Sequence, residues 1–202
     1  MIAIIDYGAG NIFSVKNALD YLGYESVLTK SADEIKRADA IILPGVGAFP
    51  WAMKMLNESG FVPLIREQTK IKPFLGICLG MQLIFDKGYE FEETEGLGLI
   101  GGTVEKLERE DMIIPHMGWN ELVIQNDCPL LKGLPENPYV YFVHSFAAKC
   151  DDKNISAYCD YGGKVTALVH DGKNVFGAQF HPEKSGEVGL QILRNFAELS
   201  KN

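Results

Sequence analysis

Cys78 stands in the run Gly76-Ile-Cys-Leu-Gly80, where a short apolar stretch changes to a helical pattern. A cysteine between glycines at a strand-to-helix turn is held in an exposed position, because small neighbours relieve crowding at a sharp turn; this is the nucleophile elbow. A free thiol is only a few per cent thiolate at neutral pH, so a nucleophilic Cys78 needs a base. Without the flanking glycines, a free cysteine is more typical of a small buried hydrophobic residue.

The downstream segment His181-Pro-Glu183 supplies a base and a partner for that base. It follows the strand-like run 175–180, and the proline ends the strand between two polar side chains. His181 can accept the Cys78 proton, while Glu183 accepts a hydrogen bond from the other imidazole nitrogen and fixes the tautomer. Alone, the segment is also typical of a surface turn. Together with the elbow it indicates a Cys–His–Glu triad.

A third segment, Pro44-Gly-Val-Gly47, follows another buried strand pattern. Backbone N–H groups of Val46 and Gly47 can point at an oxyanion, together with the N–H of Leu79 just after the nucleophile. One such donor is worth about 3–4 kcal/mol in comparable acyl-transfer sites. Taken alone, the segment also fits an ordinary β-turn.

The elements that must position these segments read as alternating strands and helices. Strands are predicted over 2–5, 26–28, 40–43 and up to the elbow, with helices over 12–22, 33–37, 49–57, 62–70 and 81–87. Shorter strands follow over 102–107, 121–124, 139–143, 157–161, 164–170 and 174–180, before a final helix over 186–200. The pattern predicts an α/β fold in one domain, 1–202. Its open, mostly parallel or mixed sheet is flanked by helices, and the second half completes the same sheet.

Composition narrows the class of protein. The 202 residues carry a net charge of -8, which argues against binding to a phosphate backbone. No apolar run approaches the roughly 20 residues that span a bilayer, and the N-terminus lacks a basic region. We therefore expect a cytoplasmic protein without a membrane segment. Its four cysteines show no C-x-x-C spacing and are expected to be free thiols.

Two glycine patterns and the histidines have ordinary explanations. The run 96–101 matches G-x-G-x-x-G, but it opens no helix, so we expect no dinucleotide site there. Gly8-Ala-Gly10 reads as a tight turn. No histidine has a second histidine or cysteine three to four residues away, so neither a metal site nor a cofactor is expected. The run 114–120 is either a packed corner or a contact surface, since exposed Trp and Met are typical of interfaces.

The elbow Gly-Ile-Cys-Leu-Gly-Met-Gln, the Pro-Gly-Val-Gly loop and His-Pro-Glu together resemble class I (triad) glutamine amidotransferases over essentially the whole chain. This resemblance implies a flavodoxin-like architecture. It also implies that Cys78 attacks the side-chain amide of glutamine and that His181 protonates the departing ammonia. A γ-glutamyl thioester would then be hydrolysed to glutamate.

Within that family, Pro-Gly-Val-Gly-Ala-Phe and Pro-His-Met-Gly-Trp-Asn are similar to motifs of the glutaminase subunits of imidazole glycerol phosphate synthases. The resemblance implies a heterodimer in which ammonia passes to a (βα)₈-barrel cyclase subunit of histidine biosynthesis. It also implies a glutaminase that is nearly silent until the cyclase binds its own substrate. We expect a peptide rotation at Gly45 to bring the Val46 N–H into the oxyanion hole, since flanking glycines lower the cost of rotation.

The resemblance also carries functional residues over to this chain. Glutamine recognition falls on Gly47, Gln82, Glu90, Ser145 and Phe146. Glu90 suits the substrate ammonium, and relatives often place Tyr where this chain has Phe146. Contacts with the partner are expected from Asn11, His116, Met117 and Trp119.

Two other functions stay open at this point. A free-standing thiol hydrolase of γ-glutamyl or ester substrates would use the same triad and would be fully active without a partner. A non-catalytic scaffold that docks on a barrel would leave Cys78 unlabelled by a glutamine-analogue electrophile. The complete set of Cys78, His181 and Glu183 argues against the scaffold.

Overall fold

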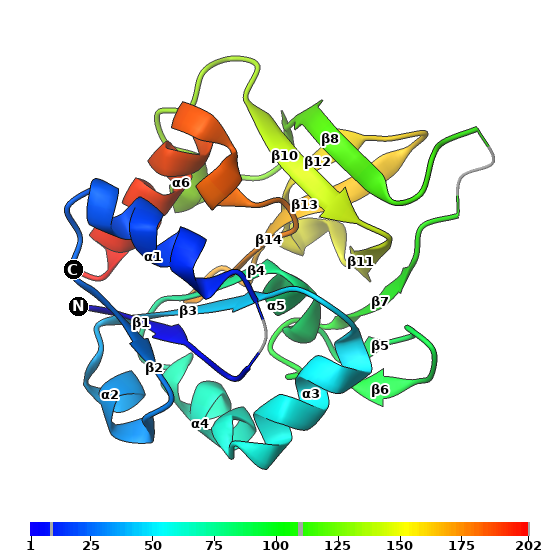
Figure 1. Ribbon diagram of the computed structural model, residues 1–202. Coiled ribbons are helices and arrows are strands. Elements are labelled where there is room, and N and C mark those ends of the chain that lie inside the picture. Colours follow the sequence, from blue (N-terminus) through cyan, green and yellow to red (C-terminus); the bar gives the residue numbers. More distant parts are fainter. Residues whose placement is uncertain (9, 109–110, 202) are drawn as a thin grey trace.

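Helices cover both faces of a central sheet in the computed structural model, which describes residues 1–8, 10–108 and 111–201 (Figure 1). On one face, α1 (Ile12–Tyr21) lies beside α6 (Gly186–Leu199). On the other face lie α2 (Ala32–Arg37), α3 (Phe49–Glu58) and α4 (Phe61–Gln68). The predicted α/β class, with an open sheet between helices, is confirmed.

The main sheet of the described residues runs in the order β2 (Ser26–Thr29), β1 (Ile2–Ile5), β3 (Ala40–Gly45), β4 (Phe74–Cys78), β14 (Val175–Ala178), β13 (Lys164–His170), β12 (Ile155–Asp160) and β9 (Val123–Ile124). From β2 to β14 neighbouring strands are parallel, and from β14 to β9 they are antiparallel. The sheet is therefore mixed, and the carboxyl ends of β3, β4 and β14 lie together at one edge. Open α/β sheets place their ligands at that edge.

Strand β1 shows why helices pack on both faces. Successive side chains of a strand point to opposite faces. Ile2 and Ile4 belong to the core cluster that contains Leu19 of α1. Ala3 and Ile5 belong to the other cluster, which is formed with α2, α3 and α4. A parallel strand that is buried on both faces must be apolar throughout, as β1 is.

The second half of the chain only partly completes this sheet, so that prediction is corrected. An antiparallel pair forms from β8 (His116–Glu121) and β10 (Tyr139–His144). A further sheet runs in the order β11 (Phe146–Cys150), β7 (Gly102–Lys106), β5 (Lys87–Gly88) and β6 (Thr94–Glu95). The segment 114–120, which the sequence left open as a packed corner or a contact surface, is thus largely strand β8, whose hydrogen bonds are made to β10.

The helix after the elbow also differs from its prediction over 81–87. Helix α5 (Leu79–Leu83) starts directly after Cys78 and ends early. The chain must leave the helix there, because Lys87 and Gly88 pair with β6 and β7. Short 3₁₀ helices complete the described elements: η1 (Pro129–Leu131), η2 (Asp152–Asn154) and η3 (Pro182–Lys184).

Helix length and polarity also bear on membranes. Within the described ranges, every helix is too short or too polar to cross a bilayer.

Candidate active site

Cys78 is the last residue of β4, and its backbone has φ +54° and ψ -110°. A positive φ is strained for a residue other than glycine, and such strain is typical of functional sites. The neighbouring glycines allow the turn to pack. A β-carbon at Gly76 would lie 2.5 Å from the Gly80 oxygen, and one at Gly80 would overlap the carbonyl oxygen of Leu43. Only glycine fits at these two positions, so the elbow seats Cys78 tightly against β3.

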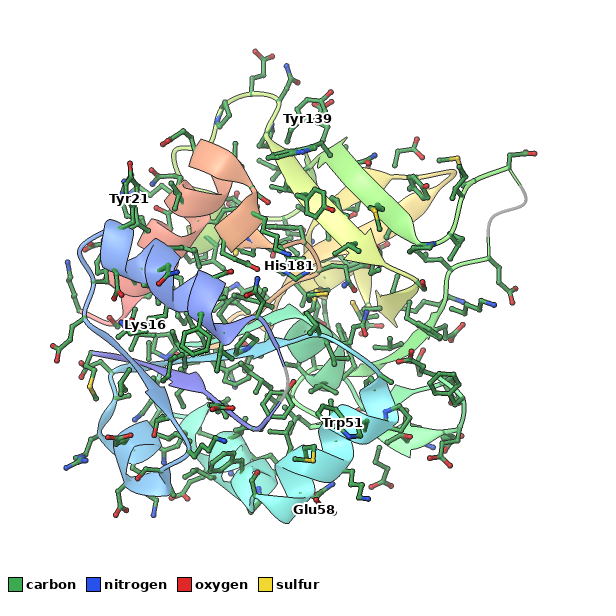
Figure 2. The ribbon with its side chains drawn as sticks, viewed as in Figure 1. Lys16, Tyr21, Trp51, Glu58, Tyr139 and His181 are labelled. Atoms are coloured by element: carbon green, nitrogen blue, oxygen red, sulfur yellow. The ribbon has the colours of Figure 1, made fainter. Side chains whose placement is uncertain are left out.

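His181 and Glu183 follow strand β14 and form a buried pair. His181 Nδ1 lies 2.8 Å from Glu183 Oε1, and the side chains are only 3% and 1% exposed. Figure 2 shows His181 among packed side chains near the centre of the molecule. Because Nδ1 donates to the carboxylate, Nε2 is the nitrogen that can take a proton from a nucleophile. Among the described residues, Nε2 has no hydrogen-bond partner.

Opposing effects act on the charge of His181. Burial lowers the pKa of His181, but interactions with Cys78 and Glu183 more than offset burial and raise it to about 9. The histidine is therefore set to hold a proton received from the thiol. Cys78 and His181 line the same pocket. Hydrogen bonds of this catalytic kind often tighten only when substrate binds.

The other three cysteines are poor nucleophile candidates. Burial raises the pKa of Cys150 to about 11 and that of Cys159 to about 12. It also raises the pKa of Cys128. These thiols stay protonated near neutral pH, and none of them lines the pocket beside His181.

The pocket beside Cys78 has a volume of about 310 Å³, which suits a small molecule. It brings together all of the residues that the sequence suggested for the oxyanion hole and for glutamine. These are Val46, Gly47, Leu79, Gln82, Glu90, Ser145 and Phe146. They come from the loop after β3, from helix α5, from the segment after β5 and from the junction of β10 and β11, so segments far apart in the chain form the pocket.

Polar contacts hold two of these side chains in place. Gln82 Nε2 donates to the Phe146 carbonyl at 3.0 Å and to Gln179 Oε1 at 3.1 Å. Glu90 Oε2 accepts from the Phe49 N–H at 2.8 Å, at the first turn of α3. The helix N-terminus favours this negative charge, which places a carboxylate on the pocket wall.

Sequence reasoning missed Gln179. Its side-chain nitrogen lies 3.9 Å from Cys78 Sγ, and its oxygen accepts from Gln82. The Val143 carbonyl also lies 3.9 Å from Sγ. Gln179 precedes His181 by two residues at the end of a strand, where positions i and i+2 share a face. This alternation could have indicated that Gln179 lies on the same side as His181.

Tyr7 was missed as well, and no local pattern marked it. Its hydroxyl is buried and has no hydrogen-bond partner among the described residues. A β-carbon at Gly45 would lie 2.5 Å from that hydroxyl, and one at Gly10 would lie 3.2 Å from the Gly45 Cα. The backbone just before the Val46–Gly47 loop is thus enclosed on several sides, and Gly47 itself has φ +109°.

Tyr7→Phe is expected to raise the free energy of unfolding by about 1 kcal/mol, because it removes a buried hydroxyl that lacks a partner. The melting temperature should rise by roughly 2–4 °C for a chain of this size. Tyr24→Phe is the matched control, because the Tyr24 hydroxyl donates to Glu198 at the surface and its loss should not stabilise the protein. Thermal unfolding of both variants checks the prediction, and equal melting temperatures for Tyr7→Phe and the unsubstituted protein would contradict it.

The residues expected at a partner interface fall into two groups. Met117 and Trp119 are 61% and 54% exposed on β8, and Asn11 is half-buried at the start of α1. His116 is 0% exposed, so the expectation that its side chain contacts a partner is corrected. Alternation along β8 explains the difference, because His116 faces inward where Met117 faces outward.

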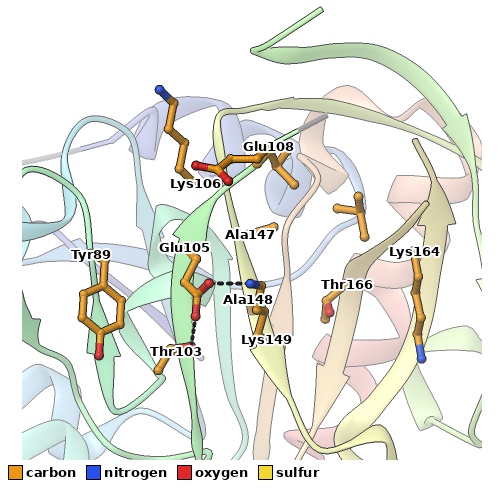
Figure 3. Close-up of a pocket in the computed structure, with 12 residues that line it drawn as sticks. Tyr89, Thr103, Glu105, Lys106, Glu108, Ala147, Ala148, Lys149, Lys164 and Thr166 are labelled. Atoms are coloured by element: carbon orange, nitrogen blue, oxygen red, sulfur yellow. Dashed lines mark hydrogen bonds and ion pairs between the residues drawn. The ribbon is translucent and has the colours of Figure 1, made fainter. Parts of the chain in front are cut away.

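A larger hollow of about 650 Å³ is lined by other residues than the pocket beside Cys78 (Figure 3). Its described lining comes from β7, β11 and β13 and contains neither cysteine nor histidine. Glu105 pairs there with Lys149 and accepts a hydrogen bond from Thr103 at 3.0 Å. The chemistry of the chain is therefore concentrated in the smaller pocket beside Cys78.

An elbow cysteine, a buried histidine–carboxylate pair and an adjoining pocket are features of enzymes that use a thiol nucleophile. The chain belongs to the class-I glutamine amidotransferase family, whose model matches residues 3–199.

Two relatives and one solved structure define the similarity further. Imidazole glycerol phosphate synthase subunit HisH from Bacillus cereus (strain G9842) is 54% identical over 97% of this chain and 93% of that protein. The subunit of the same name from Caldanaerobacter subterraneus subsp. tengcongensis is 51% identical over 100% of this chain and 99% of that protein. The structure of PurLQS from Thermotoga maritima has a TM-score of 0.76 at 22% identity, covering 98% of this chain and 97% of that one. This last likeness concerns the fold alone.

Proposed function

We propose that the chain is the glutaminase subunit of an imidazole glycerol phosphate synthase. It hydrolyses glutamine to glutamate and ammonia, and the ammonia passes to a (βα)₈-barrel cyclase subunit. That subunit forms imidazole glycerol phosphate and an aminoimidazole carboxamide ribonucleotide in histidine biosynthesis. The single observation that carries the proposal is the pocket in which Cys78, His181 and Glu90 meet. The names of the two relatives supply the particular synthase.

Substrate recognition follows from the pocket wall. Glu90 attracts the α-ammonium of glutamine, and backbone N–H groups near Ser145 and Phe146 hold its carboxylate. The side-chain amide then extends toward Cys78 at the elbow. Gln82 stabilises the wall through its bond to the Phe146 carbonyl.

The first half of the reaction makes a thioester. Cys78 gives its proton to His181 Nε2, and the thiolate attacks the side-chain amide carbon of glutamine. The carbonyl electrons move to oxygen, and the oxyanion accepts hydrogen bonds from the N–H of Leu79 and from the Val46–Gly47 loop. As the intermediate collapses, the amide nitrogen takes the proton from His181 and leaves as ammonia.

The second half releases glutamate. A water molecule gives a proton to His181 and adds to the thioester carbon. Collapse of this intermediate breaks the bond to sulfur and frees glutamate, and the Cys78 thiolate recovers the proton. Glu183 stabilises the imidazolium in both halves through the bond to Nδ1. These steps use no metal or cofactor.

The partner is proposed to bind as a heterodimer over Asn11, Met117 and Trp119. Exposed Met and Trp side chains are typical of protein interfaces, and strand β8 presents both. Coupling between the two subunits acts through the Val46–Gly47 loop, where a peptide rotation completes the oxyanion hole. We place the complex in the cytoplasm.

The deciding experiment measures glutamine hydrolysis by the chain alone, with purified cyclase subunit, and with cyclase plus its ribonucleotide ligand. The proposal expects strong stimulation that is greatest with the ligand present. Three equal, high rates would instead identify a free-standing Cys–His–Glu hydrolase of γ-glutamyl substrates. Ammonia formed in the stimulated reaction should appear in the cyclase product rather than in solution.

Glu90→Gln is expected to raise the KM for glutamine about tenfold or more, because a neutral amide pairs weakly with the substrate ammonium. The Gln oxygen can still accept from the Phe49 N–H, so α3 keeps its first-turn contact. Glu92→Gln is the matched control, since Glu92 is exposed and lies outside the pocket. Steady-state glutaminase kinetics with the cyclase subunit measure both, and equal KM values would remove Glu90 from glutamine binding.

A further inference from the structure

A chain of three hydrogen bonds runs from strand β8 to the wall of the catalytic pocket. Asn120 Oδ1 lies 2.9 Å from His116 Nε2, and His116 Nδ1 lies 3.0 Å from His144 Nε2. His144 Nδ1 then lies 2.8 Å from the Phe146 carbonyl oxygen. Strands β8 and β10 lie side by side in Figure 1, and the two histidines are direct cross-strand partners in this pair.

Both imidazoles are buried and fixed in orientation. The His116 ring is stacked between the rings of Tyr161 and Phe142, at centroid distances of 3.9 Å and 4.7 Å. His144 lines the pocket, whereas His116 lies behind it. This series of hydrogen bonds thus connects the pocket to strand β8, whose outer face carries Met117 and Trp119.

The last hydrogen bond of this series, between His144 and the Phe146 carbonyl, bears on substrate binding. The Phe146 carbonyl oxygen has two lone pairs, one facing His144 and one accepting from Gln82 Nε2 at 3.0 Å. This carbonyl belongs to the backbone segment proposed to hold the glutamine carboxylate. The position of His144 therefore helps to set the position of that segment.

The acceptors at the two ends of this series of hydrogen bonds determine where protons are needed. Asn120 Nδ2 donates to the Asp160 carbonyl at 3.2 Å, so Asn120 Oδ1 can only accept from His116. The Phe146 carbonyl likewise can only accept from His144. Three hydrogen bonds between two acceptors require three ring N–H groups, whereas two neutral imidazoles supply two.

The pair stays neutral near pH 7, because burial lowers the pKa of His144 to about 4 and lowers that of His116 as well. The titratable group that acts on the pair from outside is His181, which also lowers the pKa of His144. The hydrogen bond with Asn120 raises the pKa of His116 but offsets the effect of burial only in part. His116 Nδ1 and His144 Nε2 are only 3.0 Å apart, so one of the two protons must lie between them. The other proton can serve only one end, so Asn120 and the Phe146 carbonyl compete for it.

We propose that His116 and His144 are positioning residues for the glutaminase reaction. They link strand β8 to the glutamine pocket, because Asn120 on β8 and the Phe146 carbonyl at the pocket compete for the protons of the two imidazole rings. When both protons shift toward the pocket, His144 Nδ1–H holds the Phe146 carbonyl. When they shift toward Asn120, that carbonyl faces a bare nitrogen and moves away. The inference rests on the proposed function, and a partner seated on β8 would bias the choice.

Two variants of the full chain test the competition, and the same sign is expected for both. His116→Phe keeps an aromatic ring between Tyr161 and Phe142 but cuts the link between His144 and Asn120. The His144 proton then stays on Nδ1 and holds the Phe146 carbonyl, so the KM for glutamine should fall about threefold. Asn120→Ala removes the competing acceptor and should lower the KM about threefold. In both variants kcat with the cyclase subunit should change less than threefold, because Cys78 and His181 are untouched.

Tyr161→Phe serves as the control, because it keeps the stacked ring and removes only the hydroxyl that donates to the Ile113 carbonyl. Its KM should match that of the unsubstituted chain. A KM that rises in either His116→Phe or Asn120→Ala would reveal a merely structural role and overturn the proposal. An unchanged KM in His116→Phe would do the same.

A spectroscopic readout is independent of activity. In protein labelled with ¹⁵N-histidine, ring nitrogen shifts report which nitrogens carry protons. Asn120→Ala should show a proton on His144 Nδ1 and none on His116 Nε2, and the reverse arrangement would overturn the inference. If glutamine is not hydrolysed at all, the proposed function fails while this measurement still decides the proton arrangement. The same measurement decides if His116→Phe does not fold.

Discussion

Cys78→Ala is expected to lower kcat for glutamine hydrolysis by about 10⁴-fold or more, which removes turnover from an ordinary assay. The variant removes the atom that forms the thioester, and none of the other cysteines lines the pocket beside His181. Alanine is well tolerated by the packing, because it leaves the glycines of the elbow in place. Glutamate release in the presence of the cyclase subunit measures the effect.

Cys150→Ala is the matched control for this prediction. Cys150 is a half-buried free thiol on β11 and lies outside the catalytic pocket, so its loss should leave kcat within about twofold. A glutamine-analogue electrophile should label the unsubstituted chain and Cys150→Ala but not Cys78→Ala. Retention of turnover or of labelling by Cys78→Ala would show that another residue is the nucleophile.

Glu183→Gln should lower kcat by about 10³-fold, the second largest effect expected for this site. The amide has no charge to stabilise the imidazolium that forms at His181. Its NH₂ group can also donate to Nδ1, which would place the histidine proton on Nε2 and prevent acceptance of the Cys78 proton. Because the Glu183 side chain is only 1% exposed, water cannot replace the lost interaction.

The same variant has a signature in the pH dependence of stability. The pKa of His181 is raised to about 9 from an ordinary value of 6.5, so the folded state binds this proton more tightly than the unfolded chain does. That contribution is complete below about pH 6.5 and is lost as the pH rises through 9. Glu183 is one cause of the raised pKa, so Glu183→Gln should lower it. The stability advantage of the unsubstituted protein over Glu183→Gln should therefore shrink between about pH 6 and 9.5.

Urea unfolding across this pH range measures the difference between the two proteins. Glu187→Gln is the control, because Glu187 is exposed in the first turn of α6 and does not contact His181. It should retain full turnover and show the pH profile of the unsubstituted protein. A gap between Glu183→Gln and the unsubstituted protein that stays constant with pH would mean that Glu183 does not control the His181 proton.

Local sequence signals were strongest where one backbone geometry demanded particular residues. The glycines around Cys78 predicted the elbow, and the structure gives the reason, since β-carbons at Gly76 and Gly80 would meet backbone atoms. The strands before His181 were equally readable, because β13 and β14 lie within the strands predicted over 164–170 and 174–180 and pair antiparallel. The hairpin and the contact between Gly76 and Gly80 are local in the sequence, whereas the contact of Gly80 with Leu43 joins the start of α5 to strand β3, which pairs with β4.

Features that depend on distant pairing were not predictable from the sequence. Strand β8 was not predicted as a strand, because its inward residues, His116, Gly118 and Asn120, are not apolar. They are satisfied by the β10 backbone, by a second histidine and by aromatic faces, all far away in the chain. Tyr7 was missed for a related reason, since only the folded chain brings its hydroxyl beside Gly45.

The pairing of β14 with β4 has a consequence for how activity first appears. Cys78 and Gln179, which lies beside the base, are 101 positions apart in the sequence. The parallel pairing of β4 with β14, in which Phe74 pairs with Val175, brings the two regions together. Long-range parallel pairing is slow to form, because loop-closure entropy must be overcome first. During synthesis Cys78 therefore emerges long before its base, and it remains an unactivated thiol until the last strand enters the sheet. Reducing conditions during refolding should consequently matter most in this interval, when the thiol is open to oxidation but not yet able to act on glutamine.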